Sequence, residues 1–113
     1  MDEREARIGR NEALFRTVNE QIEALGQGLA SLAPRPMTIV CECGELACAQ
    51  QIRVSVDQYE RIRSDSTLFF VVPGHEIPDV ETPVEFHEEF VVVRKHEGGE
   101  TELARALDPR RSA

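Results

Sequence analysis

The stretch "IVCECGELACAQQI", residues 39–52, marks the point where a helical pattern gives way to strands, and it holds all three cysteines of the chain. Cys41 and Cys43 are separated by one residue, and Cys48 follows after four more. Residues i and i+2 of an extended segment face the same side, so both thiolates can reach one ion. A spacer of this length occurs in zinc sites, and Gly44 permits a tight turn that aims backbone N–H groups at sulfur. We therefore predict a zinc-knuckle-like loop.

A tetrahedral zinc site needs a fourth ligand, and the chain offers three histidines. His75 is the best candidate because it follows the apolar stretch 68–73, which is predicted to be a strand beside the strand that leads into the cysteines. His87 lies in an acidic, proline-broken stretch and is the second choice, and His96 ends an amphipathic strand. The predicted metal ligands are Cys41, Cys43, Cys48 and His75. Thiolates alone do not separate zinc from iron.

Two other interpretations of the cysteines stay open. Clustered thiolates exchange readily, so the loop can be a thiol-based redox sensor, with Cys41 and Cys48 as the less strained disulfide pair. The cysteines can also be ordinary buried residues. An enzyme is the less favoured class, because a site closed by four protein ligands leaves no open position, and Glu76 can act as a base only if water takes the fourth position.

Residues 3–32 predict one long helix, which prolines at 34 and 36 end. Apolar residues recur there at alternating steps of three and four, as in a heptad seam. The predicted seam comprises Ile8, Asn11, Phe15, Val18, Ile22, Leu25, Leu29 and Leu32. It can pack on the protein's own sheet, or it can form a helix–helix interface with a partner protein or in a homodimer. Asn11 in the seam would fit control of register in a dimer.

The rest of the chain predicts strands over residues 37–43, 51–56, 68–73 and 89–96, and a short helix after Ser55. Ser55 with Gln58 is a capping-box pattern, and residues 75–88 are predicted to be irregular. The predicted fold is α+β: a long N-terminal helix, then a small, mostly antiparallel sheet with one short helix and the zinc-knuckle-like loop. The predicted division is an amphipathic helix over 1–33, a zinc-binding-like core over 37–97 and a C-terminal tail over 98–113.

The composition narrows the classes of partner. The chain has 113 residues, 30% of them charged, and a formal net charge of −8. Without a basic stripe, broad contact with nucleic acid is disfavoured. A zinc-dependent DNA-binding regulator requires Arg4, Arg7, Arg10 and Arg16 to form one basic patch. With no signal-like start and no apolar run long enough to span a bilayer, we expect a cytoplasmic protein that does not bind membranes.

Four motifs, "CECGELAC", "SVDQYERIRSD", "FFVVPGHE" and "FVVVRK", together resemble a family of small uncharacterised actinobacterial proteins. Its pattern combines an N-terminal helix with a C-E-C-x4-C loop, a Y-E-x-x-R helix and a V-x-P-G-H-E turn. The resemblance covers roughly residues 10–95 and implies a coherent fold, but no established activity. The residues that the resemblance marks are Cys41, Cys43, Cys48, Tyr59, Arg63 and His75.

Overall fold

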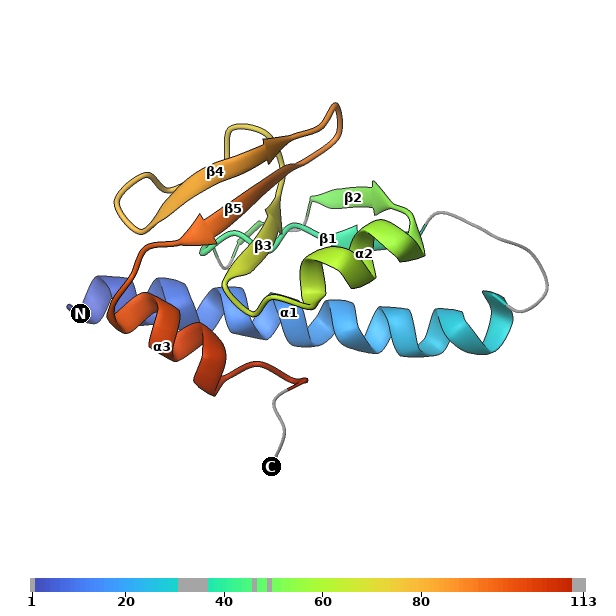
Figure 1. The fold of residues 1–113 in the computed structure, drawn as a ribbon, viewed down its shortest axis with the longest axis horizontal. Helices are drawn as coiled ribbons and strands as arrows, with labels where there is room; N and C mark the ends of the chain where they lie inside the picture. Colours follow the sequence, from blue (N-terminus) through green and yellow to red (C-terminus); the bar gives the residue numbers. More distant parts are fainter. Residues whose placement is uncertain (1, 31–36, 46, 49, 111–113) are drawn as a thin grey trace.

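The computed structural model describes residues 2–30, 37–45, 47–48 and 50–110, and its α+β fold confirms the predicted class (Figure 1). No helix within these residues combines the length and apolar character needed to cross a bilayer. The elements are α1 (Glu3–Ala30), β1 (Met37–Val40), β2 (Gln51–Val54), α2 (Val56–Arg63), β3 (Leu68–Val71), β4 (Glu81–Phe86), β5 (Val91–Lys95) and α3 (Gly99–Ala106).

The strands form two antiparallel sheets. β1 pairs with β2, placing Ile39 opposite Ile52, and the second sheet has the order β3-β5-β4, with Phe70 opposite Val92. These side chains are almost completely buried in one core. Tyr59 of α2 stacks on Phe70 with ring centroids 5.7 Å apart, so the short helix closes the core between the two sheets.

The prediction of irregular structure over residues 75–88 is wrong for residues 81–86, which form β4. β4 is an edge strand that pairs with β5 alone, and its register shifts between Pro83 and Glu85. A proline is tolerated at a sheet edge, because there its missing N–H need not face a neighbouring strand. Prolines in a sequence therefore mark an edge as readily as a loop.

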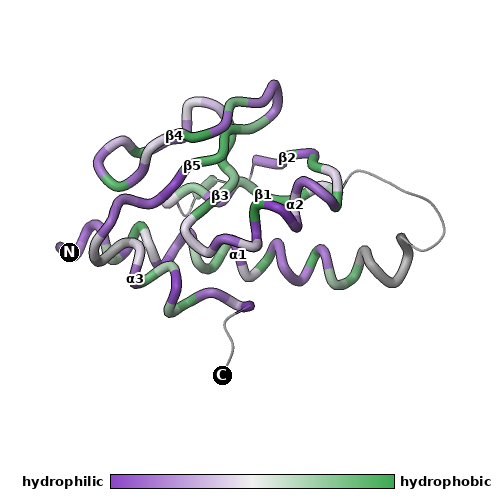
Figure 2. Tube along the Cα trace, viewed as in Figure 1, coloured by the Kyte–Doolittle hydropathy of each residue, from purple (hydrophilic) through white to green (hydrophobic). Residues whose placement is uncertain are grey.

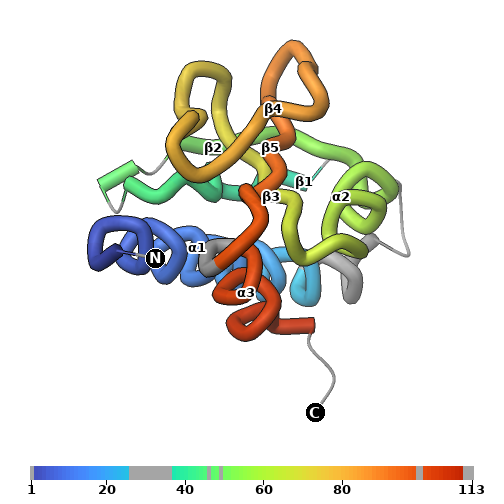
Figure 3. The backbone as a smooth tube through the Cα atoms, turned by 60° about the vertical axis from the view of Figure 1, so that its left-hand side comes forward, coloured from blue at the N-terminus to red at the C-terminus, as the bar shows by residue number. Residues whose placement is uncertain are grey.

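The capping box at the start of α2 is confirmed. The Ser55 hydroxyl accepts from the backbone N–H of Gln58, and the Gln58 side chain accepts from the backbone N–H of Ser55. Within the predicted tail, α3 packs along the N-terminal half of α1 (Figure 3). A Cβ atom at Gly9 would lie 2.6 Å from Leu103 Cδ2, so the glycine allows the two helices to approach closely.

The face of α1 that packs on the sheets is largely polar, which differs from the interpretation that the apolar seam packs on the protein's own sheet. Figure 2 shows hydrophilic and hydrophobic residues alternating along this helix. The buried polar residues are Glu12, Arg16, Asn19 and Glu23. Of the predicted seam, Ile8 is buried, Asn11, Phe15, Val18 and Ile22 are half-buried and Leu25 is 78% exposed, whereas the side chains of Leu29 and Leu32 lie outside the described part.

Backbone groups of the sheets explain why a polar helix face is buried. Arg16 donates to the carbonyl oxygens of Ser66 and Leu68, and its guanidinium lies 3.5 Å from the centre of the Phe69 ring. Asn19 donates to the Val40 carbonyl at 2.9 Å and accepts from the Val40 N–H at 2.8 Å. The Asn19 amide thus completes the hydrogen bonding of β1 as a neighbouring strand would.

Three charged residues that are far apart in the sequence form a buried ionic cluster. The Lys95 ammonium of β5 lies 2.6 Å from carboxylate oxygens of both Glu12 and Glu81, and all three side chains are buried. Burial raises the pKa of Glu12 to about 8, while the Lys95 charge lowers it and the Glu81 charge raises it. Glu12 and Glu81 therefore share one cation in a site away from water.

Candidate metal centre

Three segments of the chain bring the four predicted ligands together. Cys41 and Cys43 lie directly after β1, Cys48 lies before β2, and His75 lies in the turn after β3. One ligand atom from each residue falls within 4.8 Å of all the others. The structure therefore forms a possible metal site from residues that the sequence spacing and the neighbouring strand predict.

Hydrogen bonds to both sides hold the cysteine loop in place. The Cys41 N–H donates to the Gln50 carbonyl at 2.9 Å, which closes the β1–β2 loop. The Glu42 N–H donates to the Phe70 carbonyl at 2.7 Å, so β3 runs beside the loop as expected. Gly44 lies directly on α1, where an added Cβ would be 2.4 Å from Ile8 Cγ2. Glycine is needed at this position because there is no room for a side chain.

Glu42 positions the loop, and the sequence analysis did not identify it. Its side chain is fully buried, and one carboxylate oxygen accepts from the Phe70 N–H at 3.0 Å. The other oxygen accepts from the Asn19 amide at 2.8 Å. Neighbouring residues of an extended segment point to opposite sides, so Glu42 faces the interior while Cys41 and Cys43 face the candidate site. The alternation of Cys41, Glu42 and Cys43 is the sequence pattern from which the inward position of Glu42 could have been predicted.

A tight turn directs His75 toward the sulfurs. The His75 N–H donates to the Val72 carbonyl at 2.9 Å, and Gly74 has a φ of 93°, a conformation that favours glycine. The His75 Nδ1 atom lies 3.6 Å from the Sγ atoms of both Cys41 and Cys48. The side-chain amide of Gln50 lies 3.4 Å from Nε2, where it can hold the ring in this orientation.

These distances fit tetrahedral zinc. Bonds of about 2.3 Å to sulfur and about 2.0–2.1 Å to nitrogen, at a tetrahedral angle, place the two ligand atoms about 3.6 Å apart. The two separations between Nδ1 and sulfur are both 3.6 Å. The imidazole and two of the sulfurs therefore have the spacing that a bound ion requires, and the Cys43 sulfur lies within 4.8 Å of the other three ligand atoms.

The electrostatics suit a cation. Cys41 and Cys43 are 1% and 2% exposed, and burial raises the pKa of both thiols. The Val72 N–H points at Cys41 Sγ from 3.2 Å, and the backbone of Glu45 favours the Cys43 thiolate. Buried thiolates need a positive charge beside them, and a cation held by these residues would supply it and displace the thiol protons.

The other candidate residues have different partners. His87 lies 2.9 Å from a Glu85 oxygen and stacks on Phe90, and His96 lies 2.9 Å from the Thr82 hydroxyl. Glu76 accepts from the Gly74 N–H, so it supports the turn.

Tyr59 and Arg63, which the resemblance marks, are buried. The Tyr59 hydroxyl donates to Glu20, and Arg63 donates to Asp108. Both residues therefore make hydrogen bonds within the fold, and neither is among the candidate metal ligands.

The basic patch that a DNA-binding regulator requires does not form with all four arginines. Arg16 is 1% exposed and donates a hydrogen bond to the Ser66 carbonyl. Arg4 forms an ion pair with Asp79. Arg7 and Arg10 remain exposed on α1. The condition on which this class of function depended is therefore not met.

Comparisons with models of protein families, with curated proteins and with solved structures found no match. The resemblance to the actinobacterial family therefore stays a prediction. The possible metal site rests on its own geometry and on the chemistry of its ligands.

Proposed function

We propose that this protein is a small zinc-binding module without catalytic activity, which acts through contact with another protein in a regulatory or adaptor role. The observation that carries the zinc assignment is the convergence of three sulfurs and one imidazole nitrogen, with nitrogen–sulfur separations of 3.6 Å. Three thiolates with one imidazole form a common structural zinc set.

The metal would have a structural role, because the four residues would leave no position for a reacting water. It would join the β1–β2 loop to the turn after β3, two segments that the described backbone links through few hydrogen bonds. A domain of this size buries a limited core, so such a link contributes a large share of its stability.

The redox alternative is less favoured. A thiol sensor needs an accessible sulfur with a low pKa, whereas Cys41 and Cys43 are buried and the pKa of each is raised, first of all by burial. Cys48 is the most accessible of the three. Mild peroxide should therefore oxidise the metal-bound protein slowly.

The protein contact would use the apolar stripe of α1, defined as Leu14, Phe15, Val18, Ile22 and Leu25. Leu14 and Leu25 are 51% and 78% exposed, and the other three are half-buried. The stripe lies beside the polar face that covers the sheets, so one helix can pack on the protein's own core and on a partner. Asn11 is engaged within the chain, donating to the Gly44 carbonyl at 3.0 Å, and is not free to set dimer register.

Metal content tests the zinc site. Protein purified without added metal should carry one zinc ion per chain by elemental mass spectrometry. His75→Ala should weaken zinc binding by more than the roughly 10- to 100-fold that loss of an outer-shell partner costs. His96→Ala is the matched control, because His96 contacts Thr82, and it should keep the ion. Equal zinc content in both variants, or a metal-free wild type, would contradict the assignment.

Oligomeric state tests the stripe, with a second copy of the chain as the first partner to examine. The wild type should form a concentration-dependent dimer in size-exclusion chromatography with light scattering. Leu25→Glu should weaken the dimer at least tenfold, because it places a charge among apolar contacts. Glu3→Gln, at an exposed site near the start of α1, should leave it unchanged. A monomeric wild type at the highest concentration rules out pairing between copies.

A further inference from the structure

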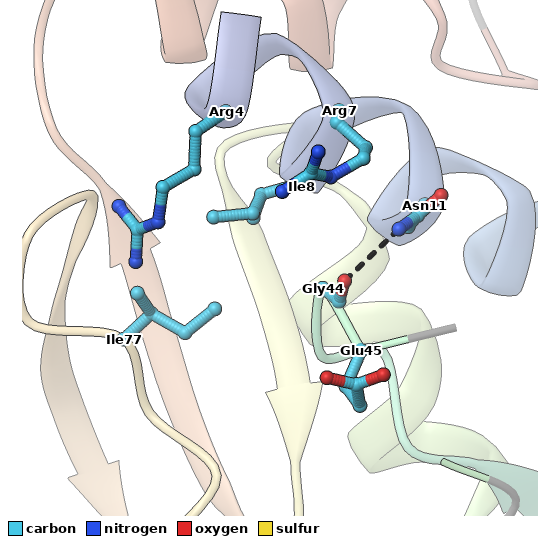
Figure 4. A pocket seen from close by; sticks show the side chains of 7 residues that line it. All are labelled: Arg4, Arg7, Ile8, Asn11, Gly44, Glu45 and Ile77. Atoms are coloured by element: carbon cyan, nitrogen blue, oxygen red, sulfur yellow. Dashed lines mark hydrogen bonds between the residues drawn. The ribbon is translucent and has the colours of Figure 1, made fainter. Parts of the chain in front are cut away.

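A cavity of about 410 Å³ lies between α1, the cysteine loop and the segment before β4 (Figure 4). We call it the α1 pocket. This volume is within the range of small-molecule sites. Its lining residues are Arg4, Arg7, Ile8, Asn11, Gly44, Glu45 and Ile77. The metal ligands are not among them, but Gly44 and Glu45 belong to the cysteine loop, so the pocket shares one wall with the metal centre.

Two cations face the pocket without strong partners. Arg4 and Arg7 are three residues apart and so lie on one face of α1. The ion pair of Arg4 with Asp79 is 3.4 Å long, and the two side chains are 51% and 71% exposed, so it is weak. Arg7 has no hydrogen bond or ion pair within the described part of the chain. The chain has a net charge of −8, but the two guanidinium groups outnumber the one carboxylate in the lining and attract an anion locally.

The rest of the lining narrows the choice of anion. Ile8 and Ile77 supply apolar surface, and Figure 4 shows Ile8 between the two arginines, with Arg4 reaching toward Ile77. Glu45 adds one negative charge to the wall. This carboxylate partly offsets the charge of the arginines, so charge alone does not decide between a monoanion and a dianion. The apolar surface favours a hydrocarbon body next to the charged head.

We propose that the α1 pocket binds a small monocarboxylate that carries a short apolar body. Arg7 would hold the carboxylate through charge-assisted hydrogen bonds, because the guanidinium fork matches two carboxylate oxygens. Arg4, on the other side of Ile8, would add a more distant attraction. Ile8 and Ile77 would contact the hydrocarbon part. Asn11 and Gly44 keep the cysteine loop against α1 through their 3.0 Å hydrogen bond, and this contact maintains the wall of the pocket.

Isovalerate, acetate and inorganic phosphate are suitable probes, titrated into the full chain and followed by isothermal calorimetry and isoleucine methyl NMR. The protein is used as purified, with its metal content recorded, because the cysteine loop forms one wall of the pocket. Isovalerate should bind saturably, shift the methyl signals of Ile8 and Ile77, and bind about tenfold more tightly than acetate or phosphate. No saturable shift, or tighter binding of phosphate, would overturn the proposal.

Two variants locate the site. Arg7→Gln should weaken isovalerate binding at least tenfold, as loss of a charge-assisted bond does. Arg10→Gln removes the same charge from an exposed position of α1 outside the lining, and it should change binding less than twofold. Ile77→Ala should weaken the binding of isovalerate but not of acetate. Equal losses in Arg7→Gln and Arg10→Gln would mean nonspecific attraction to the helix and would overturn the proposal.

Discussion

Removal of the metal is expected to lower the midpoint of thermal unfolding by roughly 15–30 °C. Binding to the folded state alone stabilises it by about 4 kcal/mol when free metal exceeds its Kd a thousandfold. In a domain of about this size, each kcal/mol corresponds to roughly 4–8 °C. Without the metal, the link between the cysteine loop and the His75 turn would be lost, while the core around Phe70 remains. Circular dichroism melts with and without a chelator measure the shift.

The control for chelation is Cys43→Ser. This variant should melt close to the chelated wild type, and the chelator should change it little, because it has already lost one of the four ligands. Hydrogen exchange should rise first in residues 41–48 and 72–76, which the metal would join. A wild type whose melt is insensitive to chelation, although zinc has been removed, would show that the ion has no structural role.

Lys95→Met is expected to destabilise the protein by about 3–5 kcal/mol at pH 8, the usual loss when one partner of a buried ionic group is removed. The variant leaves Glu12 and Glu81 buried without their shared cation. Arg94→Met is the matched control, because Arg94 is the neighbouring residue and its ion pair with Asp65 is 51% and 39% exposed. It should cost less than about 1 kcal/mol. Urea unfolding measures both free energies.

The pH dependence identifies the group responsible. The pKa of Glu12 is raised from 4.5 to about 8 in the folded protein, mainly by burial. Between these values the folded state holds a proton that the unfolded state releases, so the contribution of Glu12 to stability is greatest below about pH 4.5 and is lost as pH rises through 8. Glu23, with a pKa raised to about 7 by burial and by Glu60, adds to the same slope. Glu12→Gln should flatten the slope between pH 7 and 8; an unchanged slope would contradict this assignment.

Local patterns predicted the elements other than β4 and α3, and the spacing of the cysteines predicted the candidate site. Ser55 and Gln58 predicted the start of α2, because each of these residues is the hydrogen-bond partner of the other. His75 could be named because it follows an apolar strand that was expected beside the cysteines. In each case the required information lay within a few residues or within one pair of neighbouring strands.

The packing of α1 could not be predicted from periodicity. Its apolar residues formed the clearer pattern, yet the sheets cover Glu12, Arg16 and Asn19. Burial of a polar side chain is favourable only when its partner is in place. The partners here are backbone carbonyls and the ammonium of Lys95, which no pattern within the helix reveals.

The polar inner face of α1 has a consequence for protein synthesis. Glu12 meets its ammonium partner 83 residues later, and Glu20 meets Arg110 90 residues later. Asn19 can bond to β1 soon after that strand has been synthesised, whereas the charge of Glu12 stays unpaired until β5 has been made. During that interval this face is charged and hydrated, so it offers little to chaperones or to neighbouring nascent chains. The ion pairs of the inner face therefore form only once β5 and Arg110 have been synthesised, after the partners of Asn19 and Arg16 are already in place.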